Sequence, residues 1–455
     1  MQYLLPCSAS FLCIDRFSVL DDPGELENAD GRVPFWPVFT ALLRSPVKSP
    51  RQLVELLDTI AVTLRGTSES AGDYQLLLSV IRDSRPDFFD TEWPFIVELA
   101  LELPSLFPGG SLRVLGATPT LDLTKRQTAC LVAHQFLCTL RAPIWRKDFL
   151  DFSIWYGSVQ RHEQACGIYL TCLFTYLDIR HAIKQSNSEL CVGYRLATVE
   201  AGYEAMAMPP TPLGVIEVVL IDTFQTCPEQ LGLPSGAAVV TANRYIGFGQ
   251  SATQEEVHVG SSPEVCPAVL ITPPLASNQV LVVKGAEAVL NITGQRRDIK
   301  VIPQSNTVSV DWSRRTMLFM DALELDVESD DKGLPDLAPG NLSREVNKAA
   351  IAFSSGVYDA VYSPLWGCGA FGGDPFVKVM LLWCAASVAS VPLRILCDGE
   401  SQGVAKHLDQ LIEAVRSRLQ TAQDVMSLLE SVPRDTKKLA TFHYMMDQLG
   451  DRLRL

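Results

Sequence analysis

The sequence predicts an α/β protein in which a mixed β-sheet is flanked by helices and preceded by an all-helical part. Three observations predict this class. Helical apolar spacing dominates residues 1–190, short apolar runs recur from residue 191 onward, and further helical patterns are interleaved with the later runs. Such alternation of strand-like and helical segments is typical of an α/β sheet with helices on its faces. We therefore expect a helical accessory domain over 1–190 and an α/β domain over 191–455 that ends in helices.

The first part of the chain contains apolar residues at helical spacing between proline-rich breaks. The segments with this spacing are residues 50–62, 93–103, 122–140 and 162–179. Ser49 and Thr124 stand where an N-cap is needed, because a hydroxyl there accepts a bond from the first turn. Pro104 is expected to end the second helix. Isolated histidines on such helices, His134 and His162, are expected to be structural.

The second part combines short apolar runs with longer helical patterns. The runs expected to be strands are residues 191–197, 215–221, 237–240, 269–271, 280–283, 317–320 and 393–397. The segments expected to be helices are residues 344–353, 375–388, 404–419 and 422–429. The acidic segment 324–336 is expected to be a solvated loop. Runs of 4 to 8 apolar residues bounded by turn signals are typical of buried strands.

Composition and charge limit the classes of partner. The chain has 455 residues, 47% of them hydrophobic, and a formal net charge of −14. This length and apolar fraction suit a large globular core and more than one domain. The negative charge argues against a broad electrostatic surface for nucleic acid or anionic membrane. We expect no membrane association and no direct sequence-specific contact with nucleic acid, so an anionic ligand would be held locally.

Cysteine and histidine spacing gives no sign of a metal. The 12 cysteines include no CxxC pair, and the 6 histidines supply no HExxH. Many cysteines lie in apolar runs, where a free thiol behaves as a small hydrophobic side chain. We therefore expect no metal and no cofactor, and a reduced, intracellular protein.

A first glycine loop stands beside paired carboxylates. Gly247 and Gly249 follow the expected strand 237–240, and Gln254, Glu255 and Glu256 come shortly after. Glycine lets a ligand approach the main chain closely. Residues 257–259 alternate like a strand, so the two carboxylates can converge only at a loop-to-strand junction. Taken alone, the pair would be an exposed acidic surface, but its position beside the glycines favours acid/base chemistry on a phosphate-bearing ligand.

A second glycine cluster precedes the helical pattern of residues 375–388. Four glycines surround Phe371 between Trp366 and Asp374. Asp374 as N-cap and Pro375 at the first helical position would explain those two residues fully. They do not explain the four glycines, so we favour a ligand loop whose amides bind a pyrophosphate. No Gly-Lys-Ser/Thr follows, so this is not a Walker A loop, nor is it a Rossmann fingerprint.

Together these two clusters resemble the poly(ADP-ribose) glycohydrolase family. The block from Trp366 to Asp374 is intact, and so are Ala242-Asn243-Arg244 and Gln254-Glu255-Glu256. The resemblance covers roughly residues 120–430 and implies a helical accessory domain followed by a macrodomain-like α/β fold. It also implies a metal-independent hydrolase that releases ADP-ribose from poly(ADP-ribose).

The resemblance implies specific roles for residues of this chain. Glu256 would act as general acid and then base on the ribose–ribose bond, with Glu255 and Asn243 holding the ribose hydroxyls. Ile216 and Glu217 match the pair that contacts adenine. The remaining implied substrate contacts are Gln254, Gly247, Gly249, Cys368, Gly369, Ala370, Phe371 and Gly372.

The chain also departs from the family pattern. Phe248 replaces the middle glycine of the first loop, and the spacer before Gln254 is short. Val240 stands where an acidic residue is common, and Gln295 stands where an aromatic residue packs against the adenosine. A further aromatic is missing around Leu396. These changes indicate a divergent branch.

Two functions remain open at the level of sequence, with a weaker third. The chain is either an exo-acting poly(ADP-ribose) glycohydrolase or a non-catalytic reader of ADP-ribose and its polymer; the third is removal of single ADP-ribose units. The expected partners are poly(ADP-ribose), ADP-ribose and ADP-ribosylated proteins. We expect a monomer in the nucleus or cytoplasm. His258 is expected to be an ordinary strand residue, and Arg314 and Arg315 a solvated pair.

Overall fold

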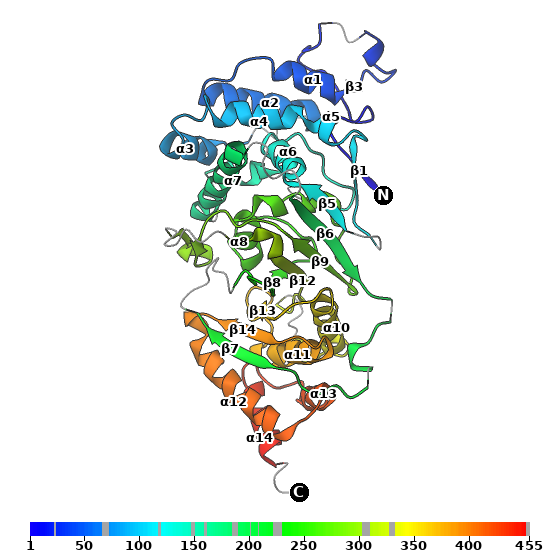
Figure 1. Ribbon diagram of the computed structural model, residues 1–455, viewed down its shortest axis with the longest axis vertical. Helices are drawn as coiled ribbons and strands as arrows, with labels where there is room; N and C mark the ends of the chain where they lie inside the picture. Colours follow the sequence, from blue (N-terminus) through cyan, green and yellow to red (C-terminus); the bar gives the residue numbers. More distant parts are fainter. Residues whose placement is uncertain are drawn as a thin grey trace.

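An eight-stranded mixed sheet lies between a helical part and a group of C-terminal helices (Figure 1). The computed structural model describes residues 1–21, 24–65, 72–116, 120–146, 151–158, 162–183, 190–200, 202–207, 209–221, 230–302, 310–326 and 333–451. The helices of the first part of the chain cluster above the sheet in this view, and α12 and α14 lie at the opposite end. The fold expected from the sequence is therefore confirmed.

The central sheet has the strand order β5-β6-β9-β12-β8-β13-β14-β7. The strands, in this order, are Leu121–Thr124, Cys191–Thr198, Gln279–Lys284, Thr316–Asp321, Ala237–Ala242, Val361–Ser363, Leu393–Cys397 and Ile216–Leu220. From β12 to β7 neighbouring strands run parallel, whereas β5, β6 and β9 pair antiparallel. The carboxyl ends of β12, β8, β13, β14 and β7 therefore meet at one edge, where ligands bind in open α/β sheets.

Helices cover both faces of this sheet. The helices of the first part of the chain are α1 (Phe35–Leu42), α2 (Pro50–Arg65), α3 (Gln75–Ser84), α4 (Glu92–Leu101), α5 (Leu103–Leu106), α6 (Lys125–Phe136) and α7 (Glu163–Ile183). Later come α8 (Gln254–Gly260), α9 (Ala268–Ile271), α10 (Asn341–Phe353), α11 (Pro375–Val388), α12 (Gln402–Arg418), α13 (Ala422–Glu430) and α14 (Thr441–Asp451). Short paired strands complete the chain: β1 (Gln2–Leu4) with β4 (Ser111–Arg113), β2 (Leu12–Cys13) with β3 (Val33–Pro34), and β10 (Ile292–Thr293) with β11 (Lys300–Val301).

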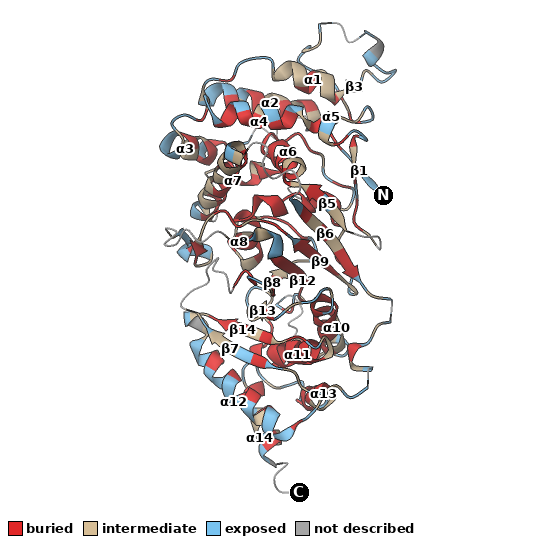
Figure 2. Cartoon of the chain, viewed as in Figure 1, coloured by how far each residue is buried: buried red, intermediate tan, exposed pale blue. Residues whose placement is uncertain are grey.

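Strand alternation divides the buried residues into two cores. Met317 and Phe319 of β12 pack with the helices of the first part, whereas Leu318 and Met320 pack with α10 and α11 on the other face. Successive side chains of a strand point to opposite faces, which produces this division. Figure 2 shows the result as buried ribbon at the centre and exposed turns on α12.

Most expected elements are confirmed, with some corrections. Thr124 caps α6 in a full capping box, and β5 just before it belongs to the central sheet. Pro104 does not end a helix, because it lies in the first turn of α5, where a missing N–H costs nothing. Residues 269–271 form part of α9 and not a strand. Within the described residues, no helix is both long and apolar enough to cross a membrane.

Candidate active site

The first glycine loop leads into a helix and not into a strand. Thr253 caps α8: its side chain accepts a bond from the N–H of Glu256, whose carboxylate in turn accepts one from the N–H of Thr253. The spacing Thr-x-x-Glu is the sequence signal of this capping box. The expected strand over 257–259 is therefore wrong, and the first helical turn aims consecutive side chains in different directions.

Gln254 and Glu255 attach α8 to the end of β8. Gln254 accepts a hydrogen bond from the N–H of Thr241 (2.7 Å) and donates one to the carbonyl of Val239 (3.1 Å). The Glu255 carboxyl accepts from the N–H of Asn243 at 2.9 Å and of Gly247 at 3.2 Å. The amide of Gly247, which was expected to contact the substrate, thus binds the Glu255 carboxyl group.

Glu255 is a buried carboxyl group with a strongly shifted pKa. Burial raises its pKa from 4.5 to about 8, while the amides of Asn243 and Gly247 oppose the rise. Neighbouring Glu256 raises it further, and Arg146 lowers it. A carboxyl group with a pKa near 8 carries a proton at neutral pH, which is a common property of active-site acids.

Gly249 makes room for the carboxyl group of Glu256. A methyl group at Gly249 would lie 2.0 Å from Oε1 of Glu256, so the carboxyl group would have to move to admit a larger residue. The backbone carbonyl of Gly249 accepts a hydrogen bond from Nε1 of Trp155 at 2.9 Å. Glycine at position 249 thus leaves space for the Glu256 carboxyl group. The hydrogen bond from Trp155 anchors the loop to the helical part of the chain.

Both glycine loops line one cavity of about 630 Å³ at the carboxyl edge of the sheet. This volume suits a nucleotide-sized ligand. Sequence-predicted residues in its wall are Asn243, Gly247, Gln254, Glu255, Glu256, Cys368, Gly369, Ala370 and Phe371. Additional wall residues include Arg146, Tyr245, Arg296, Tyr362 and Asp398, which no sequence motif indicated.

Four predicted residues are not part of this wall. Ile216 and Glu217 begin β7, and Ile216 lies roughly 16 Å along the chain from Ile221, which lines the cavity. Glu217 instead faces Arg394 at 3.7 Å. Gly249 and Gly372 are not among the residues that line the cavity. Gly372 has a φ of +77°, and its N–H donates to the carbonyl of Gly369 at 3.2 Å. The described cavity therefore does not bring Ile216 and Glu217 to the carboxylates.

Main-chain amides of the second loop belong to residues that line the cavity. Among the described residues, the N–H groups of Gly369, Ala370 and Phe371 have no acceptor. A methyl group at Gly369 would meet nothing within 4 Å. Asp374 caps α11 by accepting from Phe376 and Val377, as predicted. Successive unbonded amides form a concave site for anions.

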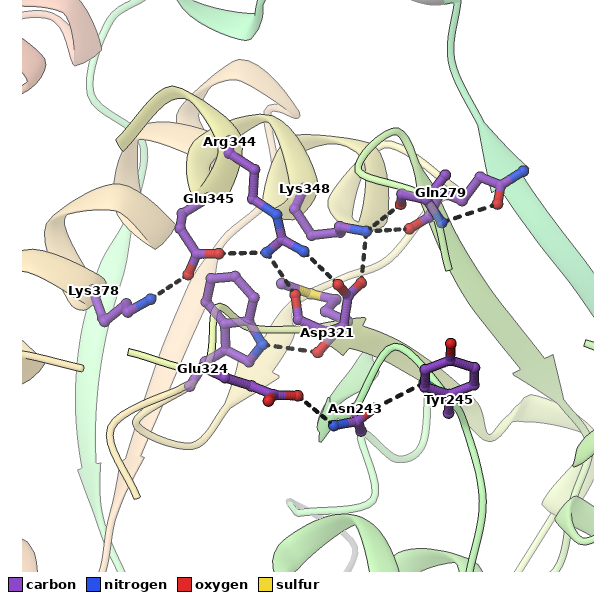
Figure 3. Close-up of polar contacts among 12 residues, drawn as sticks. Asn243, Tyr245, Gln279, Asp321, Glu324, Arg344, Glu345, Lys348 and Lys378 are labelled. Atoms are coloured by element: carbon purple, nitrogen blue, oxygen red, sulfur yellow. Dashed lines mark hydrogen bonds and ion pairs between the residues drawn. The ribbon is translucent and has the colours of Figure 1, made fainter. Parts of the chain in front are cut away.

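Asn243 is oriented by two partners (Figure 3). Its Nδ2 donates to Glu324 at 2.7 Å, and its Oδ1 accepts from the N–H of Tyr245 at 3.0 Å. Both of its polar atoms are therefore assigned, and the side chain is fixed at the end of β8. Glu324 is exposed, as expected for the acidic segment 324–336, of which 327–332 lie outside the described residues. The expectation of a solvated loop is wrong at the far end of the segment, because Asp336 is buried there and pairs with Lys378.

A buried network of charges lies behind the second loop (Figure 3). Asp321, at the end of β12, pairs with Arg344 and with Lys348 (2.6 Å) of α10. Glu345 joins Arg344 to Lys378 of α11. Lys378 lies 5.1 Å from the ring centroid of Trp366, which begins the loop. The network thus connects the sheet, two helices and the second loop.

Phe248, which departs from the family pattern, lies in an aromatic cluster. Its ring packs against Phe152 at 5.5 Å and Trp155 at 5.3 Å between centroids. Arg146, in the same part of the chain, donates to the carbonyl of Ile246. Its guanidinium covers Gly247, where a methyl group would lie 2.2 Å from Nη2. The first glycine loop is therefore held by side chains from the first part of the chain.

Of the other histidine and arginine candidates, His258 lines the cavity, whereas Arg314 and Arg315 do not. Among the described residues, no three His, Cys, Asp or Glu side chains could hold a metal ion together. Burial lowers the pKa of His258 to about 3, so this helical residue is neutral. Arg314 is exposed as expected, but Arg315 is fully buried and donates to Ser262 and Ala286. The prediction of a solvated pair is therefore wrong for Arg315.

Two family models match the chain. The helical-domain model of poly(ADP-ribose) glycohydrolase matches residues 81–195, and the model of its macro domain fold matches residues 229–404. The chain is 23% identical to poly(ADP-ribose) glycohydrolase 1 of Caenorhabditis elegans over 79% of this chain and 46% of the relative. It is also 23% identical to a probable poly(ADP-ribose) glycohydrolase 2 of Arabidopsis thaliana, over 82% of this chain and 84% of the relative. The chain therefore spans about half of the first relative and most of the second.

Solved structures are similar as well. One of them is a poly(ADP-ribose) glycohydrolase mutant of Deinococcus radiodurans in complex with ADP-ribose, with 15% identity over 49% of this chain and 94% of that chain. Its TM-score of 0.31 is too low to support an inference about this chain.

Proposed function

This chain belongs to the poly(ADP-ribose) glycohydrolase family, and we propose that it hydrolyses the ribose–ribose O-glycosidic bonds of poly(ADP-ribose) to release ADP-ribose. One observation carries the proposal. Glu255 and Glu256 line one cavity in different environments, the first buried and held by two amides, the second reaching the cavity from a helix N-terminus. Adjacent carboxyl groups in different environments can divide acid/base and binding roles.

In the proposed reaction, Glu256 transfers the proton. Its carboxyl group donates to the leaving ribose oxygen as the glycosidic bond breaks, which leaves an oxocarbenium-like centre. The resulting carboxylate then takes a proton from the attacking water. Gly249 and the cap at Thr253 fix this carboxyl group, so a small change of position would affect the rate strongly.

Glu255 and Asn243 position the ribose beside Glu256. Glu255 is protonated at neutral pH and can donate to a hydroxyl or accept from one. Asn243 is fixed by Glu324 and by the backbone of Tyr245. The amides of Gly369, Ala370 and Phe371, which have no acceptor within the described part of the chain, suit the diphosphate, since they need no counter-charge to bind an anion.

The reader hypothesis is less well supported by the site. A protein that only binds ADP-ribose needs the amides of the second loop but no proton donor. Here two features position the Glu256 carboxyl group at the cavity: the glycine at position 249 and the capping box with Thr253. Binding of ADP-ribose alone requires neither feature. We therefore retain the hydrolase as the proposed function.

The test compares wild type with Glu256→Gln for release of ADP-ribose from automodified poly(ADP-ribose) polymerase and for ADP-ribose binding. We expect Glu256→Gln to lose at least about a hundredfold in turnover and to bind ADP-ribose normally. Glu413→Gln, at an exposed position of α12, is the matched control and is expected to behave as wild type. Binding without release by wild type would support the reader, and equal release by both proteins would place the acid elsewhere.

The substrate suggests the setting of this activity. We propose that ADP-ribosylated proteins are the natural partners, and that the enzyme acts as a monomer in the nucleus or cytoplasm, as part of the DNA damage response. The polymer is made on proteins, so its hydrolysis occurs at modified partners. Fractionation of cells that express the tagged chain, with and without DNA damage, tests this setting.

A further inference from the structure

Two non-glycine residues with left-handed backbone meet at the mouth of the cavity. Ala252 has a φ of 51° and Arg296 a φ of 53°, and the N–H of Arg296 donates to the carbonyl of Ala252 at 3.0 Å. Such a conformation is uncommon for residues with a side chain and costs about 1 kcal/mol or more at each position. Paired strain of this kind persists where the surrounding structure fixes it, often at ligand sites.

The turn that carries Arg296 is fixed by its own backbone. Gly294 has a φ of +76°, and a methyl group there would lie 2.2 Å from the carbonyl of Asp298. The N–H of Asp298 donates to the carbonyl of Gln295 at 3.0 Å, and pairing of β10 with β11 closes the turn. The result places the side chains of Gln295 and Arg296 in the cavity wall, whereas Arg297 lies outside it.

Arg296 is a cation with no carboxylate partner among the described residues. The other cationic side chain of the wall, Arg146, is buried and donates to the main chain at Ile246. Three acidic residues, Glu255, Glu256 and Asp398, line the same cavity. The amides of the second loop can bind a diphosphate without a charged partner, and the Arg296 guanidinium can add charge-assisted hydrogen bonds to it. Arginine suits this task, since its planar fork binds phosphate oxygens in pairs.

We propose that Arg296 binds the diphosphate of ADP-ribose and selects ligands that carry it, in the turn where the family's aromatic residue is replaced by Gln295. Its backbone bond to Ala252 also joins the bound ligand to Thr253, the cap of the helix that carries Glu256. The inference rests on the proposed function, because it takes ADP-ribose as the ligand. It adds a residue that no family motif indicates.

The test uses Arg296→Gly, because glycine adopts the left-handed backbone freely and the variant loses only the side chain. Arg297→Gly is the matched control: it removes the same charge one position away, outside the wall. Calorimetry would measure binding of ADP-ribose and of adenosine, which has no phosphate. We expect Arg296→Gly to weaken ADP-ribose at least about tenfold and adenosine less than about twofold. We expect Arg297→Gly to change neither, and Arg296→Lys to recover part of the loss.

Each other outcome has a separate meaning. If wild type binds ADP-ribose and Arg296→Gly binds it equally well, the inference is overturned and the proposed function stands. If Arg296→Gly weakens adenosine as much as ADP-ribose, the guanidinium stacks on the base and the diphosphate assignment is wrong. Equal losses in both glycine variants would reduce the effect to general surface charge. Absence of any ADP-ribose binding by folded wild type would overturn the proposed function itself.

Discussion

Adjacent residues of one helical turn have different chemistry here because their surroundings differ. Glu255 points into the protein and receives two backbone amides, whereas Glu256 lies against a glycine at the cavity. Burial alone moves the pKa of the former far above that of a free carboxyl group. The side chains that determine these surroundings, rather than the Glu-Glu pair itself, are therefore the informative targets for mutation.

We predict that Gly249→Ala abolishes most activity without unfolding the protein. The added methyl group would lie 2.0 Å from Oε1 of Glu256, so the carboxyl group must move. A displacement of about 1 Å at a catalytic group can cost about a hundredfold in rate. Steady-state turnover together with thermal melting measures the two effects separately.

Gly403→Ala is the matched control for that substitution. Gly403 lies in the first turn of α12, and a methyl group there would meet nothing within 4 Å. We expect unchanged turnover and a stability gain of up to about 1 kcal/mol, because alanine is the better helix former. Normal turnover in Gly249→Ala would contradict the assignment of Glu256 to that contact.

Protonation of Glu255 predicts a pH dependence of stability. A carboxyl group whose pKa rises from 4.5 to about 8 on folding stabilises the native state fully below pH 4.5 and loses this contribution as pH rises toward 8. Over this window the free energy of unfolding of wild type should therefore fall more steeply than that of Glu255→Gln, by a few kcal/mol at most. Urea denaturation at pH 5, 6, 7 and 8 gives both slopes, and parallel slopes would contradict the shift.

At the scale of elements, the first glycine loop depends on the helical part of the chain. We predict that Phe248→Ala lowers the free energy of unfolding by about 3 kcal/mol and reduces turnover, because the substitution leaves a void beside Phe152 and Trp155. Phe17→Ala, at a side chain that is 50% exposed, is the control and should cost less than about 1 kcal/mol. Urea denaturation and turnover measure both. Equal losses in the two variants would mean that the aromatic cluster does not hold the loop.

Apolar periodicity predicted most elements correctly and failed where a second signal was stronger. Residues 375–388 were predicted as a helix with Asp374 as its cap, and α11 has those bounds. Residues 257–259 alternate like a strand, yet the capping box from Thr253 to Glu256 starts a helix there. The short run 269–271 was ambiguous for the same reason, since three apolar residues fit one helical turn as well as a strand.

The candidate site was predictable where residues lie next to each other in sequence. Glu255, Glu256 and the second loop were found because glycines and carboxylates form local patterns. Arg146 and Arg296, which line the cavity, and Trp155, which binds the carbonyl of Gly249, were missed because each comes from another segment and has no motif of its own. Tertiary contact alone brings them in, so a single sequence carries no signal for them.

At the scale of the whole molecule, the buried charges connect the sheet to the second loop. The side chains of Lys348 and Lys378 are 0% and 1% exposed. Asp321 pairs with Lys348, and Glu345 and Asp336 pair with Lys378. Removing an ion from such a network leaves its partner charged and buried, which costs more than the pair itself contributes. The exposed pair Arg51–Glu55, at 88% and 59% exposure, has no such penalty.

We therefore predict that Lys378→Met lowers the free energy of unfolding by about 3 kcal/mol, because Glu345 and Asp336 lose their shared cation. Lys378→Met with Asp336→Asn should recover part of this loss, since Glu345 keeps Arg344 whereas Asp336 has no other cation among the described residues. Arg51→Met, the exposed control, should cost less than about 0.5 kcal/mol. Urea denaturation measures all three.

Lys378 also lies over Trp366, so the single variant should weaken ADP-ribose binding through the second loop. A single variant as stable as Arg51→Met would show that the network does not connect sheet and loop.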